Sequence, residues 1–289
     1  MRQKMRGNLR KVIKFMKAIK RRYFYRERIV RHKLGGRELT IIRGTIGEAP
    51  DYDDAWFFYL SNNCEILFDI GANIGYTALL ANLTMRPKRI LLIDPNPEAL
   101  AWAAKNLLLN GFADNCLFNT KIVSDTGGER LQFFTSTVSA SGSIFRSNAE
   151  TADIMNEFIW VDTITIDQLV TQYEMVPDLL KVDVEGAEYK VLQGARQLAS
   201  LRKSRFLVEL HTRKDLSMKD NGELILSWAK SVGFKAWYLK VGTELISAEA
   251  IASRGRCHLL LQPDDWKYPE FLEGVPQKAA LPELNHHGK

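Results

Sequence analysis

The chain has 289 residues, of which 46% are hydrophobic and 26% are charged, and its formal net charge is +6. This composition excludes a disordered chain, a collagen-like repeat and a miniprotein, and it supplies enough apolar side chains for one large domain or two small ones. The three cysteines, Cys64, Cys116 and Cys257, are widely spaced and form no CxxC pair, so we expect neither a disulfide framework nor a zinc site. A reducing, cytoplasmic location fits this cysteine usage.

An N-terminal arm holds much of the basic charge. Residues 1–33 contain 14 of the 40 lysines and arginines and a single acid, Glu27, so the arm carries +13 and the rest of the chain carries −7. Its apolar residues recur at helical spacing: Leu9, Val12, Ile13, Met16, Ile19 and Tyr23. The pattern predicts a basic amphipathic helix that either lies on an anionic membrane or covers part of the domain. No uncharged apolar stretch is long enough to span a bilayer, so we expect neither a transmembrane helix nor a signal peptide.

The chain divides into three predicted regions. Residues 1–60 comprise the basic arm and an aromatic linker at 56–59, which we expect to pack the arm onto the body. Residues 61–265 form the main domain. Residues 266–289 lack periodicity and are expected to form a loosely attached tail.

Apolar runs alternate with helix-like segments in the main domain. The strand candidates are 66–70, 89–94, 117–123, 179–184, 205–210, 235–239 and 257–261, and the helix candidates are 76–83, 97–110, 187–199 and 224–232. Asn96, Pro97 and Gly111 mark the ends of one helix. The alternation predicts a doubly wound, mostly parallel α/β sheet of seven strands, covered on both faces.

A β insertion interrupts this alternation. Extra β segments are expected at 131–134 and 158–166, and the serine-rich stretch 139–143 between them is expected to be a flexible loop. We expect this insertion to cover a cleft.

A glycine turn follows the first strand and points to the ligand. In the segment 68–76, Gly71 and Gly75 allow close backbone approach, but Asn73 and Tyr76 stand where a dinucleotide fingerprint requires glycines. Asp69 disfavours a phosphate and suits the ammonium group of S-adenosylmethionine. The ligand chemistry therefore favours that cofactor.

Acids at the ends of the next strands fit the rest of such a cofactor. Asp94 ends the second strand, where an acid accepts hydrogen bonds from ribose hydroxyls, and a simple helix cap beside Asn96 is the less favoured alternative. Ser124 and Asp125 end the third strand, where an adenine edge would lie, and a turn into the following glycines is the alternative.

At these residues the chain resembles the FkbM family of S-adenosylmethionine-dependent O-methyltransferases. Four segments carry the similarity in the family's order: FDIGANIGYT (68–77), LIDPNP (92–97), the VSD segment with its serine-containing insertion (123–143), and LLKVDVEGAEYKVLQGA (179–195) closing with VELH (208–211). The resemblance spans residues 61–262 and implies a Rossmann-like methyltransferase fold and a hydroxyl acceptor on a sugar or natural product. Asp94 stands where many members have Glu, and either acid can hold a ribose. The expected cofactor-binding residues are Asp69, Gly71, Asn73, Gly75, Asp94, Asn96, Ser124, Asp125 and Asp183.

Polar side chains at two strand ends are the catalytic candidates. Side chains two apart on a strand share a face, and ligands of open α/β sheets bind beyond the carboxyl ends of the strands, so we expect Asp183, Glu209 and His211 to converge. His211 is the first candidate for the base that removes the hydroxyl proton, because its ordinary pKa lies near neutrality. Three alternatives remain: Asp183 caps a helix, His211 is structural, or all three residues bind a divalent cation.

The predicted function is therefore O-methylation of a glycan or metabolite by a cytoplasmic or membrane-face enzyme. A nucleic-acid methyltransferase is one rival, suggested by the basic arm, but residues 183–186 (DVEG) lack the Asp/Asn-Pro-Pro-aromatic arrangement used for flipped bases. A non-catalytic protein that binds membranes or RNA is another. Such a protein would not need a cofactor turn with Asp69 and Asp94 in register.

Overall fold

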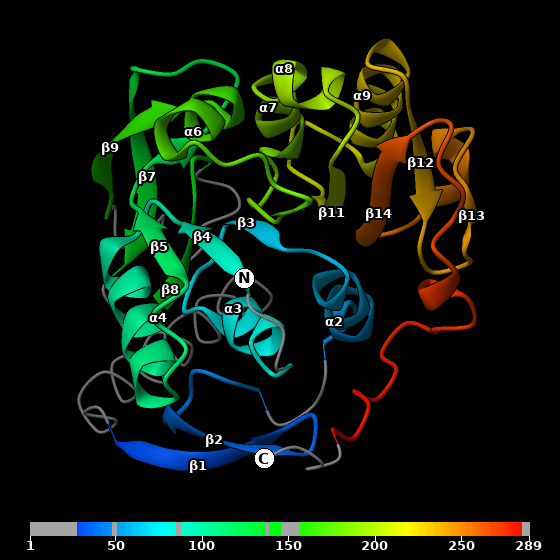
Figure 1. The fold of residues 1–289 in the computed structure, drawn as a ribbon. Coiled ribbons are helices and arrows are strands. Elements are labelled where there is room, and N and C mark those ends of the chain that lie inside the picture. Colours follow the sequence, from blue (N-terminus) through cyan, green and yellow to red (C-terminus); the bar gives the residue numbers. More distant parts are fainter. Residues whose placement is uncertain (1–27, 48–50, 85–87, 137–138, 146–156, 285–289) are drawn as a thin grey trace, which may run out of the picture.

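The computed structural model describes residues 28–47, 51–84, 88–136, 139–145 and 157–284 (Figure 1). The helix expected at residues 9–23 lies outside this part of the chain. Within the described residues, no helix is long and apolar enough to cross a membrane.

A central sheet of eight strands organises the domain, in the order β13-β12-β14-β11-β10-β3-β4-β5. The neighbours from β11 to β5 are parallel, whereas β14 runs antiparallel between β11 and β12. The strand bounds are β3 Ile66–Ile70, β4 Arg89–Ile93, β5 Cys116–Asn119, β10 Leu179–Val182, β11 Arg205–His211, β12 Phe234–Tyr238, β13 Thr243–Glu244 and β14 Arg256–Pro263. The predicted doubly wound sheet is confirmed, with the two-residue β13 added at one edge.

Helices cover both faces of this sheet because its strands are apolar on both sides. Phe68 and Ile70 of β3 join one core cluster, whereas Leu67 joins the other. Figure 1 shows the helices of the first face above the sheet and those of the second below it. The first group comprises α6 Ile166–Tyr173, α7 Glu188–Gln193, α8 Arg196–Ser200 and α9 Met218–Ser231, and the second comprises α2 Asp54–Asn62, α3 Tyr76–Ala81 and α4 Pro97–Leu109.

The predicted end signals of α4 are confirmed. The Asn96 side-chain oxygen accepts hydrogen bonds from the amides of Glu98 (3.0 Å) and Ala99 (3.4 Å), and Pro97 is the first helical residue. The helix therefore begins at the carboxyl end of β4, next to Asp94.

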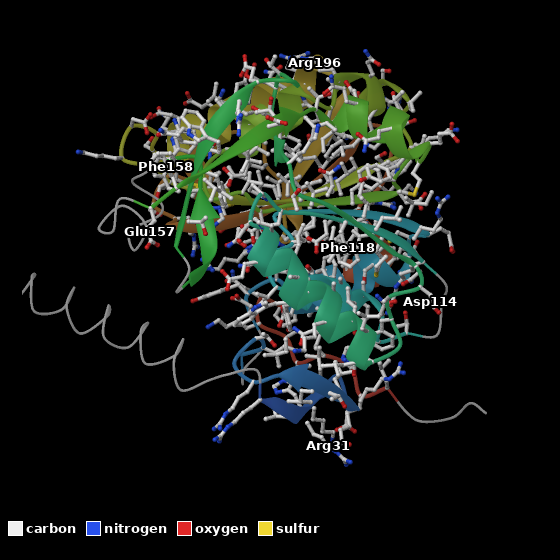
Figure 2. All side chains as sticks on the ribbon, turned by 90° about the vertical axis from the view of Figure 1, so that its left-hand side faces the viewer. Arg31, Asp114, Phe118, Glu157, Phe158 and Arg196 are labelled. Carbon is white, nitrogen blue, oxygen red and sulfur yellow. The ribbon has the colours of Figure 1, made fainter. Side chains whose placement is uncertain are left out.

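The segment expected to be an aromatic linker is part of the core. Trp56, Phe57 and Phe58 lie in α2, and each is at most 2% exposed. A hairpin precedes it, formed by β1 Ile29–Leu34 and β2 Arg37–Ile42. Its β1 residue Arg31 lies at the opposite end of the molecule from Arg196 of α8 (Figure 2).

The described part of the tail is attached more closely than the sequence suggests. The Trp56 indole donates to the carbonyl of Val275 (2.9 Å), Leu272 is 1% exposed, and the Leu284 amide donates to the carbonyl of Gly35. The segment lacks periodicity because it packs as an irregular strap with a single 3-10 turn, η3 Glu270–Leu272.

The insertion forms a second sheet, in the order β6-β9-β7-β8. Its strands are β6 Ile122–Val123, β7 Arg130–Ser136, β8 Ser139–Ser143 and β9 Ile159–Ile164. The serine-rich stretch expected as a loop is thus strand β8, because it pairs with β7. The predicted strand 117–123 also divides in two, where Asn119 accepts a hydrogen bond from the Lys121 amide and turns the chain. Phe158, just before β9, is 37% exposed on the insertion (Figure 2).

Candidate active site

A cavity of about 540 Å³ lies at the carboxyl ends of β3, β4 and β10. Open α/β sheets bind their ligands at this edge. The segments that follow the strands line the cavity, together with residues of the insertion and of the segment before α2. The lining residues include Gly71–Ile74, Thr77, Ile93–Pro95, Lys121–Val123, Lys181 and Asp183–Glu185, then Phe133, Gly142 and Ile144 of the insertion, and Thr45, Gly47 and Asp51.

The glycines of the turn serve contacts within the fold. Gly71 has φ +85°, and a Cβ on it would lie 1.9 Å from the carbonyl oxygen of Asp183. Gly75 has φ +78°, and its Cβ would lie 2.7 Å from that of Ala103 in α4. The close approach of the end of β10 therefore requires glycine at position 71, and the expectation that Gly71 also contacts a ligand stays a prediction.

Asp94 and Asn73 form the wall of the cavity beside this turn. The Asp94 carboxylate accepts hydrogen bonds from the amides of Asn73 (2.8 Å) and Asn96 (2.8 Å), and Asn96 is the helix cap. Burial raises the pKa of Asp94 to about 7. The side-chain oxygen of Asn73 is buried and has no hydrogen-bond partner among the described residues. The wall thus offers the Asp94 carboxylate as an acceptor to a ligand that brings hydroxyl donors, such as a ribose.

Five predicted cofactor residues do not line this cavity: Asp69, Gly75, Asn96, Ser124 and Asp125. Asp69 is fully buried, accepts a short hydrogen bond from the Thr77 hydroxyl and lies beside the Lys181 ammonium, so Thr77 and Lys181 separate it from the cavity. Burial raises the pKa of Asp69. The Ser124 hydroxyl instead donates a hydrogen bond to the Asp125 carboxylate (2.8 Å). Both residues follow β6, which pairs with β9 of the insertion sheet. Residues 121–123 line the cavity in their place.

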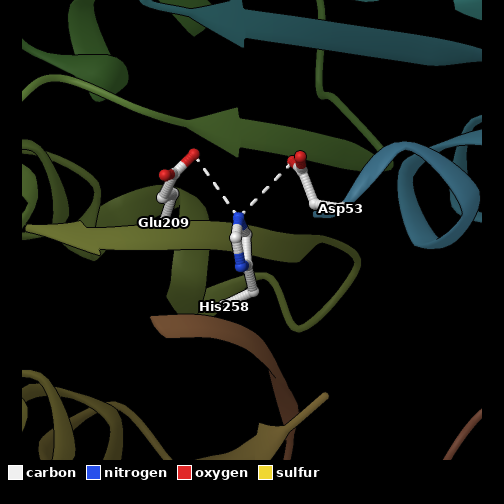
Figure 3. Close-up of side chains that lie close together, drawn as sticks. All are labelled: Asp53, Glu209 and His258. Atoms are coloured by element: carbon white, nitrogen blue, oxygen red, sulfur yellow. Dashed lines mark ion pairs between the residues drawn. The ribbon is translucent and has the colours of Figure 1, made fainter. Parts of the chain in front are cut away.

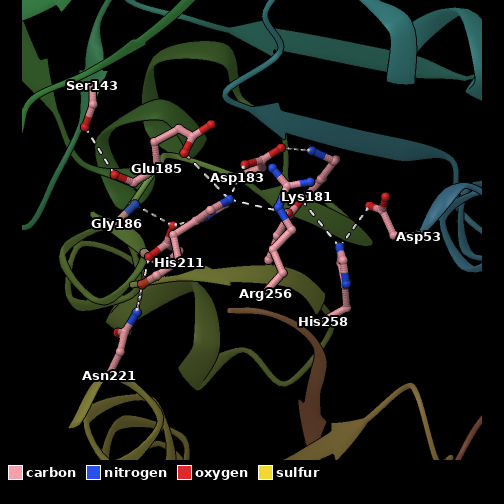
Figure 4. Close-up of polar contacts among 12 residues, drawn as sticks. Asp53, Ser143, Lys181, Asp183, Glu185, Gly186, His211, Asn221, Arg256 and His258 are labelled. Carbon is pink, nitrogen blue, oxygen red and sulfur yellow. Dashed lines mark hydrogen bonds and ion pairs between the residues drawn. The ribbon is translucent and has the colours of Figure 1, made fainter. Parts of the chain in front are cut away.

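The structure brings together the three predicted catalytic residues, and Figure 4 shows two of them, Asp183 and His211. His211 Nε2 lies 3.3 Å from Glu209 Oε1 and 3.8 Å from Asp183 Oδ1. Asp183 follows β10, whereas Glu209 and His211 lie on the neighbouring strand β11. The Lys181 ammonium donates to Asp183 Oδ2 (2.9 Å) and fixes that carboxylate at the cavity.

Glu188 decides the charge of His211. The fully buried Glu188 carboxylate lies 3.0 Å from His211 Nδ1 and also accepts a hydrogen bond from the Gly186 amide. Burial lowers the pKa of His211, but hydrogen bonds to Glu188 and Glu209 and the charge of Asp183 outweigh it and raise this pKa to about 11. The neighbouring carboxylates therefore favour the cationic form of the imidazole. The expectation that His211 serves as the base stays a prediction, and sequence patterns did not place Glu188 beside it.

A second polar cluster was missed from the sequence. His258, on β14, lies between the carboxylates of Glu209 and of Asp53 at the N-terminus of α2 (Figure 3). His258 is opposite Glu209 because β14 runs antiparallel to β11 in that register. The alternating pattern of the strands placed Glu209 on a face, but nothing in a contiguous segment signalled its partners from residues 53 and 258.

The fold and the site together define a Rossmann-like methyltransferase. Residues 69–236, more than half of the chain, match the family described as "Methyltransferase FkbM domain". The chain therefore belongs to the FkbM methyltransferase family, and the predicted resemblance is confirmed.

Individual relatives are more distant. The hexuronic acid methyltransferase AglP of Haloferax volcanii is 27% identical over 153 residues, which cover 52% of this chain and 58% of AglP. Among solved structures, methyltransferase FkbM from Methylobacillus flagellatus is 16% identical with a TM-score of 0.43, covering 68% of this chain and 43% of its own. TYW2 of M. jannaschii in complex with AdoMet is 15% identical with a TM-score of 0.43, covering 82% of this chain and 85% of its own.

Proposed function

We propose that the protein transfers a methyl group from S-adenosylmethionine to a hydroxyl oxygen of a sugar or glycan. The Asp94 carboxylate at the cavity wall carries this proposal, because an acidic acceptor at this strand end, beside a glycine turn, suits a nucleoside ribose. The similarity to AglP, a hexuronic acid methyltransferase, supports a sugar acceptor.

The residues that would hold the cofactor follow from the cavity lining. Asp94 would accept the ribose hydroxyls, Ile122 and Val123 would contact the adenine, and Asp183 lies beside the turn at the sulfonium end. The cofactor supplies an activated methyl group, so the protein has to align the acceptor oxygen and remove its proton. Alignment of this kind is worth about 7–11 kcal/mol.

Asp183 is the proposed acceptor of that proton. Its carboxylate lines the cavity, whereas His211 and Glu209 are each 6% exposed and lie behind it. Lys181 fixes one carboxylate oxygen, and Oδ1 faces the His211 imidazolium at 3.8 Å. His211 and Lys181 are therefore positioning residues, which hold Asp183 in the geometry that the acceptor hydroxyl requires.

Calorimetry with the full chain tests the cofactor. We expect S-adenosylhomocysteine to bind, NAD and ATP to bind without comparable affinity, and Asp94→Ala to weaken binding by removing the ribose acceptor. Transfer of a labelled methyl group to a uronic-acid-containing oligosaccharide tests the acceptor, with an RNA of mixed sequence as the rival. Binding of NAD alone, or transfer to RNA alone, would refute the proposal.

The basic arm is proposed to dock the enzyme on an anionic membrane surface. Its +13 charge over 33 residues supports this role, since each basic residue near such a surface adds up to about 1 kcal/mol. An enzyme whose acceptor is a lipid-linked glycan would gain from this confinement.

A further inference from the structure

A row of polar side chains lies between the sheet and helix α2, beneath the cavity. Lys181 of β10, Glu209 of β11 and His258 of β14 occupy neighbouring strands on the face that α2 covers, and each is at most 6% exposed. Asp53 reaches this row from the N-terminus of α2. Although Asp53 is the N-cap residue, its side chain makes no capping hydrogen bond, and it faces His258 instead (Figure 3).

The His258 imidazole is the unusual member of this row. It is 2% exposed, and neither ring nitrogen makes a hydrogen bond to any described residue. Its Nε2 points between two carboxylates, at 3.4 Å from Glu209 Oε2 and 3.8 Å from Asp53 Oδ2. Buried polar groups are rarely left in this state without a partner of some kind.

The spacing of these three atoms suits ligands of one metal ion. Ligand atoms at about 2.1 Å from a tetrahedral ion lie about 3.4 Å from each other. Asp53, Glu209 and His258 each offer one ligand atom, and all of these atoms lie within 4.8 Å of one another. Small side-chain movements would therefore complete the coordination.

The two oxygens of Glu209 have different surroundings. Oε1 faces the cations Arg256 (2.9 Å) and His211 (3.3 Å), whereas Oε2 faces His258. Cations thus already occupy the Oε1 side of Glu209, and Lys181 forms an ion pair with Asp183. A metal ion is accommodated better on the Asp53 side than within the trio of Asp183, Glu209 and His211.

We propose that Asp53, Glu209 and His258 bind one divalent transition-metal ion beneath the active site. One imidazole nitrogen and two carboxylate oxygens favour ions such as Mn²⁺, Fe²⁺, Co²⁺ or Zn²⁺ over Mg²⁺. The ion would fix Glu209 and, through it, the position of His211. This inference is independent of the proposed function, because its readout is metal binding.

Metal content of the full chain tests the proposal. The protein is stripped with EDTA, dialysed against Mn²⁺ or Zn²⁺, and measured by elemental analysis and calorimetry, while Co²⁺ is used for its absorption spectrum. We expect one equivalent of Mn²⁺ or Zn²⁺ and affinity at least ~10-fold lower in His258→Asn and in Asp53→Asn. Circular dichroism and binding of S-adenosylhomocysteine check that both variants are folded.

Two control variants locate the ion. His32→Asn, on the β1 hairpin, reports adventitious binding, and His211→Asn reports the competing trio. Absence of a stoichiometric ion in the wild-type protein would overturn the proposal, as would undiminished binding in both His258→Asn and Asp53→Asn. Loss of the ion only in His211→Asn would place it at the other trio and equally overturn the assignment.

Discussion

Adding a side chain at Gly71 is expected to destabilise the protein even without a ligand. The Cβ of Gly71→Ala would lie 1.9 Å from the Asp183 carbonyl oxygen, and Gly71 has φ +85°. The left-handed backbone alone costs about 1–2 kcal/mol with a side chain present.

The clash adds to this conformational cost. Relief requires the ends of β3 and β10 to separate, which weakens the hydrogen bond from the Asp183 amide to the Ile70 carbonyl (3.0 Å). Such a bond is worth about 1 kcal/mol. The free energy of unfolding should fall by about 2–3 kcal/mol in total, and the melting temperature by about 4–10 °C in a protein of this size.

Gly128→Ala is the matched control. Gly128 also has φ +85°, but a Cβ on it would meet no atom within 4 Å. The free energy of unfolding of Gly128→Ala should therefore fall only by the cost of the left-handed backbone, about 1–2 kcal/mol. Thermal melts of both variants, with and without S-adenosylhomocysteine, make the comparison. Equal melting temperatures of the two ligand-free variants, with binding lost only in Gly71→Ala, would refute the reasoning and show that the glycine serves the ligand alone.

Four further predictions follow from particular residues. Because only ionised Asp94 accepts from both ribose hydroxyls, the affinity for S-adenosylhomocysteine should rise with pH through about 7. Asp94→Asn should bind S-adenosylhomocysteine weakly at every pH. An affinity of the wild-type protein that does not change with pH would contradict the assignment of Asp94 to the ribose. Asp183→Asn should lower kcat by ~10²–10⁴-fold in a methyl-transfer assay while cofactor affinity changes little. A larger decrease of kcat in His211→Asn would instead identify His211 as the base. Since Trp56 packs in the core, a chain beginning at residue 63 should be unfolded by circular dichroism, and one beginning at residue 28 should melt like the full chain. The full chain should co-sediment with phosphatidylglycerol vesicles in a salt-sensitive manner and not with neutral ones, and equal pelleting after removal of residues 1–27 would exclude docking by the arm.

The pH prediction has an independent consequence for stability. Burial raises the pKa of Asp94 in the folded protein above its value in the unfolded chain, so the folded state binds a proton more tightly. Protonation of Asp94 therefore adds to the free energy of unfolding at acidic pH, and this contribution is lost as pH rises toward 7. A ligand that bonds to the ionised carboxylate should offset this loss.

Contiguous patterns in the sequence determined the framework of the molecule. The predicted strand 66–70 matches β3, and Asn96 caps α4 as its position before Pro97 indicates. These features depend on the apolar run, the cap and the turn residues within a few positions of each other. The same local order placed Asp94 at the cavity and Asp183, Glu209 and His211 at neighbouring strand ends.

Only the tertiary structure decided the charges and the neighbours of these groups. Asp69 lies beneath the cavity because Thr77 and Lys181 cover it, and the pKa of His211 is raised because Glu188 packs against it. Asp53 and His258, about two hundred positions apart in the chain, meet at Glu209 only after α2 has packed on the sheet and β14 has returned antiparallel. Burial and charge depend on distances in space, and no contiguous pattern of residues encodes those distances.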